Sequence, residues 1–135
     1  MPWVYNPHTG GKTIPPALKT LTERRILDYA NKNYPGKFTR IDVRFRGALC
    51  YIDAYTEPDV PRTEAPPPGE TRAQWIERLR NTPVHLCRIR YFGSADRWSF
   101  SWYTYAHDKY EPSLLITGED HGTPEEAFET STQFL

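Results

Sequence analysis

Residues 38–55, which read FTRIDVRFRGALCYIDAY, contain the strongest structural signal in the chain. Two runs of alternating apolar and polar residues flank Gly47-Ala48, and glycine at the first central position is typical of a two-residue type II′ turn. This turn fixes the register of an antiparallel hairpin, which pairs apolar residues on one face: Phe45 with Cys50, Val43 with Ile52, and Ile41 with Ala54. The other face pairs Arg44 with Tyr51, Asp42 with Asp53, and Arg40 with Tyr55. A slip of one residue would send every side chain to the wrong face, so the pattern predicts this register alone.

Residues 84–105 predict a second hairpin of the same kind, with a loop formed by residues 93–96. The apolar pairs are then Tyr91 with Trp98, Ile89 with Phe100, and Cys87 with Trp102. The opposite face carries Arg90 beside Ser99, Arg88 beside Ser101, and Leu86 beside Tyr103. Because side chains alternate along a strand, His85 is expected on the same face as Cys87. Both hairpins therefore send arginines to the face away from their apolar residues.

Three helices are predicted from the residues at their first turns. A threonine followed three residues later by Glu or Gln forms a capping box, and this spacing begins at Thr20, Thr71 and Thr123. Pro124 strengthens the last of these starts, because proline is favoured at the first helical position. Residues 113–117 are expected to form a short fifth strand before the last helix.

These elements predict an α+β fold: a single, mainly antiparallel sheet of about five strands with helices on one face, in the order α-β-β-α-β-β-β-α. A chain of 135 residues suits one domain. We expect that domain over residues 1–135, with an extended N-terminal arm at 1–16 and a stiff proline-rich loop at 56–69. Aromatic residues make up 14% of the chain and the formal net charge is zero, which argues against disorder.

Bulk properties restrict the classes of function. No apolar run reaches the length of a membrane span, and the two cysteines, Cys50 and Cys87, are too few to hold a fold together. We expect a cytoplasmic protein without membrane contact, in which both thiols are reduced and buried. Residues 19–46 carry a net charge of +5 and residues 108–135 carry −6. The zero total excludes a strongly basic nucleic-acid-binding protein but leaves room for a local basic patch.

Motifs for nucleotides, metals and cofactors are weak. Residues 6–13 read NPHTGGKT and end like a phosphate-binding loop, but Asn6 stands where that loop needs glycine, and prolines just after Thr13 block the required helix. The four histidines show no metal-ligand spacing. A site made of His85 and Cys87 can be drawn, yet cysteines in an apolar register behave as small hydrophobic residues. We therefore expect neither a cofactor nor a metal site.

The first hairpin places Asp42 directly opposite Asp53, where two like charges destabilise a sheet. Arg40 and Arg44 flank Asp42 on the same face, so salt bridges with these arginines are the favoured interpretation. The alternatives are a bound cation, or a shared proton that would make one carboxyl a general acid. A small enzyme built on this acid or metal pair, with His121 as a further group, is therefore kept as an alternative function.

The face opposite the apolar one gathers arginines and tyrosines from both hairpins. Its members are Arg40, Arg44, Arg46, Tyr51, Tyr55, Arg88, Arg90, Tyr103 and Tyr105. Guanidinium groups bind phosphates and carboxylates, and tyrosine rings give nucleic-acid bases a surface on which to stack. The combination predicts a non-catalytic binding module whose partner is a polyanion, either single-stranded nucleic acid or an acidic or phosphorylated protein segment.

Two other interpretations compete with binding. The face could be solvated and crossed by ion pairs, as in many antiparallel sheets, or covered by the N-terminal arm or the last helix. A third function class is a homo-oligomeric assembly subunit without a small ligand, in which the acidic end of one copy meets the basic face of another. The position of the last helix separates these interpretations, because a helix docked across the arginines would leave no surface for a ligand.

Overall fold

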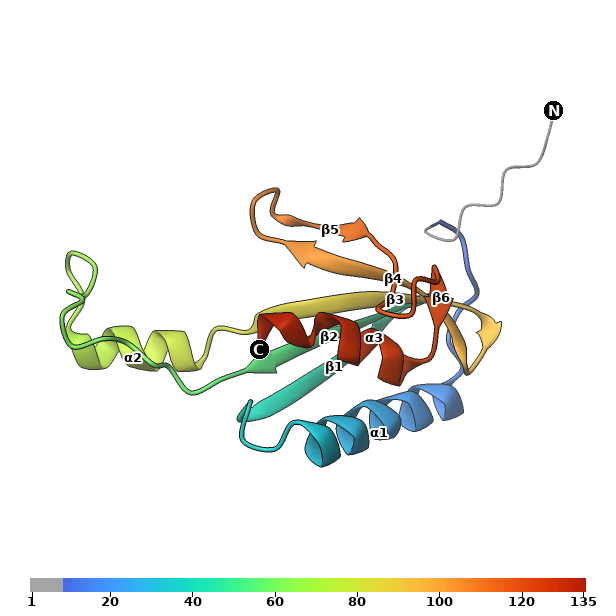
Figure 1. Ribbon diagram of the computed structural model, residues 1–135, viewed down its shortest axis with the longest axis horizontal. Helices are drawn as coiled ribbons and strands as arrows, with labels where there is room; N and C mark the ends of the chain where they lie inside the picture. Colours follow the sequence, from blue (N-terminus) through green and yellow to red (C-terminus); the bar gives the residue numbers. More distant parts are fainter. Residues whose placement is uncertain (1–8) are drawn as a thin grey trace.

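The computed structural model describes residues 9–135 and consists of an antiparallel sheet with two helices packed on one face (Figure 1). The strands are β1 (Arg40–Arg46), β2 (Leu49–Tyr55), β3 (Val84–Ser94), β4 (Arg97–Thr104), β5 (Lys109–Pro112) and β6 (His121–Gly122). Their order is β1-β2-β3-β4-β5, and β6 also pairs with β4. The helices are α1 (Pro16–Asn33), α2 (Arg72–Arg80) and α3 (Pro124–Ser131), followed by the 3-10 helix η1 (Thr132–Phe134). The predicted α+β class and element order are confirmed, with β6 as an addition.

The first hairpin has the predicted register. Val43 lies opposite Ile52 and Arg44 lies opposite Tyr51, in the pairing expected from the turn. We call the face that carries the alternating apolar residues the apolar face; its members include Ile41, Cys50, Ile52, Cys87, Ile89 and Phe100. We call the opposite face, which carries Arg44, Tyr51 and Arg88, the polar face. Val43 is only half-buried, because β1 is an edge strand of the sheet.

The second hairpin has the predicted pairs but a tighter turn. Tyr91 lies opposite Trp98, as expected. However, Ser94 pairs with Arg97, so the two strands extend into the segment predicted to be a four-residue loop. An irregularity between Tyr91 and Ser94 absorbs the extra residues of β3, which leaves the pairs farther from the turn unchanged.

A β-bulge in β3 corrects the predicted positions of His85 and Leu86. Ile52 pairs with Cys87, but the next residue of β2, Asp53, pairs with His85, so Leu86 is an extra residue in β3. Leu86 is fully buried in the core instead of lying on the polar face. His85 was expected on the same face as Cys87, but it lies on the polar face, where its ring forms a hydrogen bond with Asp53.

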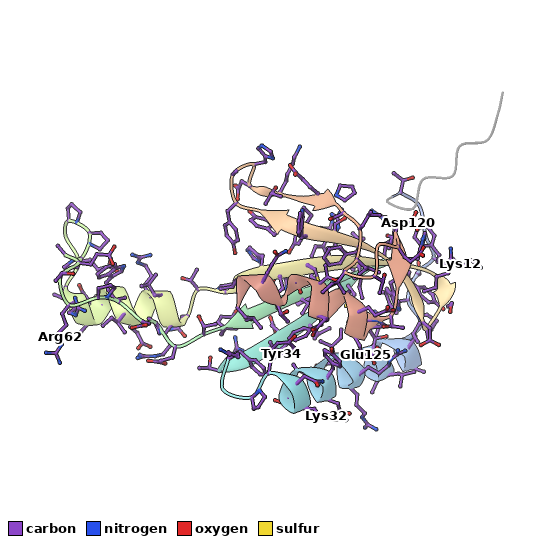
Figure 2. The ribbon with its side chains drawn as sticks, in the orientation of Figure 1. Lys12, Lys32, Tyr34, Arg62, Asp120 and Glu125 are labelled. Atoms are coloured by element: carbon purple, nitrogen blue, oxygen red, sulfur yellow. The ribbon has the colours of Figure 1, made fainter. Side chains whose placement is uncertain are left out.

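Helices α1 and α3 lie side by side over the apolar face (Figure 1). Ile26 of α1 and Phe128 of α3 are fully buried there. The guanidinium of Arg25 in α1 donates two hydrogen bonds to the carboxylate of Glu125 in α3, at 2.8 and 2.7 Å. Figure 2 shows Glu125 and Tyr34, the residue directly after α1, where the two helices meet. Packing and ion pairing together therefore hold the last helix on the apolar face.

Two of the three predicted helix starts are confirmed. Thr71 and Thr123 each accept a hydrogen bond from the backbone N–H three residues later and complete a capping box. The predicted start at Thr20 is wrong, because α1 begins earlier, at Pro16. Proline is preorganised for the first helical turn, and Pro15 at the N-cap provides no side-chain hydrogen bond.

The predicted strand at residues 113–117 is also wrong in position. The strand that pairs with β4 is β5, and it places Tyr103 opposite Tyr110. A turn over residues 105–108, with Asp108 at a φ of 52°, returns the chain earlier than expected. Residues 113–117 belong instead to the loop that leads to β6, and Leu115 anchors this loop in the core.

Helix α2 and the proline-rich segment before it project beyond the ends of β2 and β3 (Figure 1). No residue of α2 is buried. Arg72 holds this extension together by donating hydrogen bonds to the carbonyl oxygens of Val60, Pro61 and Glu64. The helices that cover the apolar face are therefore α1 and α3, while α2 lies beyond the sheet.

The N-terminal arm lies against the sheet over its described part. The N–H of Lys12 donates to the carbonyl oxygen of Tyr91 at 2.9 Å, and Ile14 is buried in the core. Residues 1–8 of the predicted arm lie outside the described residues. Within residues 9–135, no helix combines the length and the apolar character that a membrane crossing requires.

Candidate functional site

The polar face brings together arginines and tyrosines from both hairpins. Across the sheet, one row of paired residues consists of Arg46, Leu49, Arg90 and Ser99. The next row consists of Arg44, Tyr51, Arg88 and Ser101. A third row contains Asp42, Asp53 and His85. In the first two rows the arginines occupy β1 and β3, so an uncharged residue of β2 separates them.

Only part of this positive charge is neutralised by the protein. Nη2 of Arg44 lies 2.8 Å from Oδ2 of Asp53. Arg40, Arg46 and Arg88 form no ion pair with a carboxylate within residues 9–135. The predicted salt bridging of the acid pair is therefore confirmed for Arg44 with Asp53, but among the described residues neither Arg40 nor Asp42 forms a salt bridge, and the face keeps an excess of guanidinium groups.

Aromatic rings lie next to three of the arginines. The guanidinium carbon of Arg40 lies 4.0 Å from the ring centroid of Tyr55. The corresponding distances are 5.3 Å from Arg44 to Tyr51 and 5.2 Å from Arg88 to Tyr110. A cation over a ring face is attracted by the quadrupole of the ring, so these contacts orient the arginines without neutralising them.

Arg90 differs from the other arginines of the polar face. Its Nη1 donates to the carbonyl oxygen of Gly10 in the N-terminal arm at 2.9 Å. Burial, followed by the positive charge of Arg88, lowers the pKa of Arg90. The sequence predicts Arg90 as a binding residue, whereas the structure engages it with the arm.

The acid pair is asymmetric. Asp42 and Asp53 lie opposite each other as predicted. Asp53 is only 2% exposed, and its carboxylate is held by Arg44 and by Nδ1 of His85, which lies 2.9 Å from Oδ1. Asp42 is half-buried. Asp53 is therefore hydrogen-bonded to the imidazole of His85 and to Arg44, and not to Asp42.

An aromatic cluster surrounds His85. Its ring centroid lies 4.7 Å from that of Tyr103 and 6.4 Å from those of Tyr105 and Tyr110. Burial, and next the negative charge of Asp53, raises the pKa of Tyr110. The hydrogen bond that the hydroxyl of Tyr103 donates to a neighbouring carboxylate raises the pKa of Tyr103 to about 12. Tyr103 and Tyr110 are therefore neutral at physiological pH.

Sequence reasoning missed His85 and Tyr110 as members of the polar face. A tight turn at residues 105–108 places Tyr110 opposite Tyr103. The turn-forming residues of this segment could therefore have predicted Tyr110 on the polar face. The local sequence carries no comparable signal for the bulge at Leu86, which moves His85 across the sheet.

A hollow opens on the polar face. It has a volume of about 500 Å³ and is lined by Arg44, Phe45, Arg46, Tyr51, His85 and Tyr110. The last helix does not cover these residues, because α3 packs on the apolar face. The arm, over its described residues, contacts the polar face at Arg90. The hollow is therefore not covered by α3 or by the described part of the arm.

The cysteines form no site. Cys50 and Cys87 are both free and fully buried, as predicted. Burial raises the pKa of the Cys50 thiol and raises that of Cys87 to about 12, so neither is a nucleophile at neutral pH.

His121 does not join the acid pair. It belongs to β6, where its Nδ1 lies 2.8 Å from the carboxylate of Asp120, and it is not part of the lining of the hollow. In the part of the chain that the structure describes, no three His, Cys, Asp or Glu residues gather in an arrangement suited to a metal ion.

Comparisons with known proteins identify no relative. No family model matches the chain, and no curated protein or solved structure is significantly similar to it. The polar face itself is therefore the basis for assigning a function.

Proposed function

We propose that the polar face binds single-stranded nucleic acid, with phosphates at its arginines and bases on its tyrosine rings. The observation that carries this proposal is the unneutralised charge of Arg40, Arg46 and Arg88, which have no carboxylate partner among the described residues. Guanidinium groups that lie near one another repel, and a bound anion relieves that repulsion. A nucleic-acid backbone supplies such anions at regular intervals along one extended molecule.

The tyrosines favour nucleic acid over an acidic protein segment. Tyr105 is 57% exposed, and its ring lies 4.8 Å from that of Tyr103. Bases stack on such rings, whereas the carboxylates of an acidic peptide gain nothing from them. In a duplex the bases are already stacked on one another, so an aromatic surface of this kind selects single strands.

Fluorescence anisotropy with a labelled single-stranded oligonucleotide of about 12 nucleotides, a length within the range covered by comparable aromatic platforms, tests the proposal. At low salt we expect the single strand to bind more tightly than the duplex of the same sequence and more tightly than a polyglutamate peptide of equal charge. A double variant, Arg46→Gln with Arg88→Gln, should bind the single strand more weakly.

Arg24→Gln combined with Arg62→Gln is the matched control. It removes the same charge from two exposed positions, one on α1 and one on the proline-rich segment, which lies at the far end of the molecule in Figure 2. This control should bind as the native protein does. Absence of binding at low salt, or equal losses in both double variants, would contradict a specific role of the polar face.

A further inference from the structure

The Asp53 and His85 pair has the geometry of an oriented base. Nδ1 of His85 lies 2.9 Å from Oδ1 of Asp53, and the other carboxylate oxygen is held by Arg44 at 2.8 Å. Asp53 is buried, and an ionised carboxylate in such a place needs partners on both oxygens. With Nδ1–H donating to Asp53, the neutral imidazole carries its lone pair on Nε2. Asp53 is therefore a positioning residue for His85.

The lone pair on Nε2 of His85 is not used in a hydrogen bond with any described residue. Nε2 has no hydrogen-bond partner within residues 9–135, and the side chain is 32% exposed. Its surroundings hold the ring in place: Tyr103 and Tyr105 near the end of β4 and Tyr110 of β5 contact it, and Arg44 lies on the far side of Asp53. An imidazole fixed in this way can accept a proton from a bound molecule.

The hollow beside His85 supplies anion-binding groups but no serine, threonine, cysteine or lysine nucleophile. Arg44 and Arg46 line it together with His85 and aromatic rings. The hydroxyl groups among the described residues of its lining are the phenols of Tyr51 and Tyr110. Burial raises the pKa of Tyr110, so its phenol stays neutral and is a weak nucleophile. A nucleophile that belongs to the bound molecule is therefore favoured. Within a nucleic-acid strand, an internal hydroxyl next to a phosphate exists only in RNA, as the 2′-hydroxyl.

We infer that the Asp53 and His85 pair promotes cleavage of single-stranded RNA by its own 2′-hydroxyl. This inference rests on the proposed binding function and names its substrate. Nε2 of His85 takes the proton of the 2′-hydroxyl, and the oxygen uses the released electron pair to form a bond to phosphorus. The bond from phosphorus to the 5′-oxygen breaks, its electron pair stays on that oxygen, and water protonates it. The imidazolium returns its proton to the hydroxide so formed.

Each group in the hollow has a defined part in this step. Arg44 and Arg46 hold the phosphate and stabilise the charge that develops on its oxygens. Asp53 keeps Nε2 of His85 free to accept and stabilises the imidazolium once it forms. The products are a 2′,3′-cyclic phosphate and a free 5′-hydroxyl, and this proton transfer and displacement need no metal ion.

The test uses an end-labelled DNA oligonucleotide that contains a single ribonucleotide, with a chelator present throughout. The native protein should cleave at that ribonucleotide and leave a cyclic phosphate, and it should leave the all-deoxy and 2′-O-methyl versions intact. His85→Gln should lower the cleavage rate about 100-fold or more, the usual contribution of a general base. His107→Gln, at an exposed turn outside the hollow, should cleave at the native rate.

Two further variants separate chemistry from folding. Added imidazole should restore part of the activity of His85→Ala, a gain that no folding defect can produce. Asp53→Asn should lower the cleavage rate about 100-fold, yet it should bind the all-deoxy probe more tightly, because it removes a negative charge and releases Arg44. Loss of both properties in Asp53→Asn would mean that Asp53 serves only the fold.

The two proposals fail in different ways. If the native protein binds the all-deoxy probe but cleaves the ribonucleotide no faster than His85→Gln does, the inference is wrong and the binding function stands. If the native protein does not bind the all-deoxy probe at low salt, the binding function falls as well.

Discussion

Replacing Arg46 and Arg88 together by glutamine should reduce the salt dependence of single-strand binding by a calculable amount. Neither arginine has a carboxylate partner in the described residues, so their removal leaves no buried charge unpaired. Arg44 would be a poor choice for the same experiment, because its loss would strip the buried carboxylate of Asp53 of its ion pair. The chosen change therefore acts on binding with little effect on stability.

The magnitude follows from counterion release. Each phosphate neutralised on a single strand contributes about −0.7 to the slope of log affinity against log salt concentration. Arg44 is counted with Arg40, Arg46 and Arg88 because half of its side chain is exposed beside Asp53. These four arginines give the native face a slope of about −2.8, and the double variant keeps about half of it. Between about 50 and 200 mM salt, the native protein should lose about 50-fold in affinity and the variant about 7-fold.

The assay is a series of anisotropy titrations at increasing salt, read as slopes rather than as single affinities. Arg24→Gln with Arg62→Gln, which changes the net charge equally, should keep the native slope. Chemical denaturation should show that the Arg46 and Arg88 variant unfolds within about 1 kcal/mol of the native protein, since Arg88 gives up a cation–π contact. Parallel slopes for the native protein and this variant would refute the assignment of these arginines to phosphate.

Three predictions concern stability and the core. Arg25→Gln breaks the paired hydrogen bonds to Glu125, so it should lower the free energy of unfolding by about 2 kcal/mol without changing binding; a loss below about 0.5 kcal/mol would contradict the importance of this link. Gly11→Ala should cost about 2 kcal/mol or more, because φ is +95° there and a Cβ would lie 2.6 Å from a backbone oxygen of β3; an unchanged melting temperature would contradict this. Cys50 and Cys87 should react with a thiol reagent only after unfolding, and a disulfide or rapid reaction of the native protein would be inconsistent with their burial.

Much of the fold could be predicted because its signals are local. Glycine at position 47 sets the turn, and the turn sets every pair between β1 and β2. Thr71 and Thr123 cap their helices through side chains only three residues from their partners. The prediction at Thr20 used the same signal and was wrong, since Pro15 and Pro16 start α1 without a side-chain cap.

The candidate site was predictable only in part. Arg44, Tyr51 and Arg88 reach the polar face by simple alternation, which the sequence displays. His85 does not follow alternation, because the bulge at Leu86 reverses the faces of β3. The sequence predicted that Asp42 and Asp53 face each other, but it did not predict that His85 forms a hydrogen bond with Asp53.

The amino-acid order alone determines which residues alternate along each strand, where the first turn lies and which side of each hairpin is apolar. These features depend only on neighbours within a few residues. The residues that meet across the sheet depend instead on tertiary packing. Burial of Leu86 in the core displaced His85 to the polar face, and the early return of β5 brought Tyr110 beside it. Packing of α3 on the apolar face left that arrangement accessible. Such contacts join residues far apart in the chain and depend on how the whole core fills its volume, which no local pattern encodes.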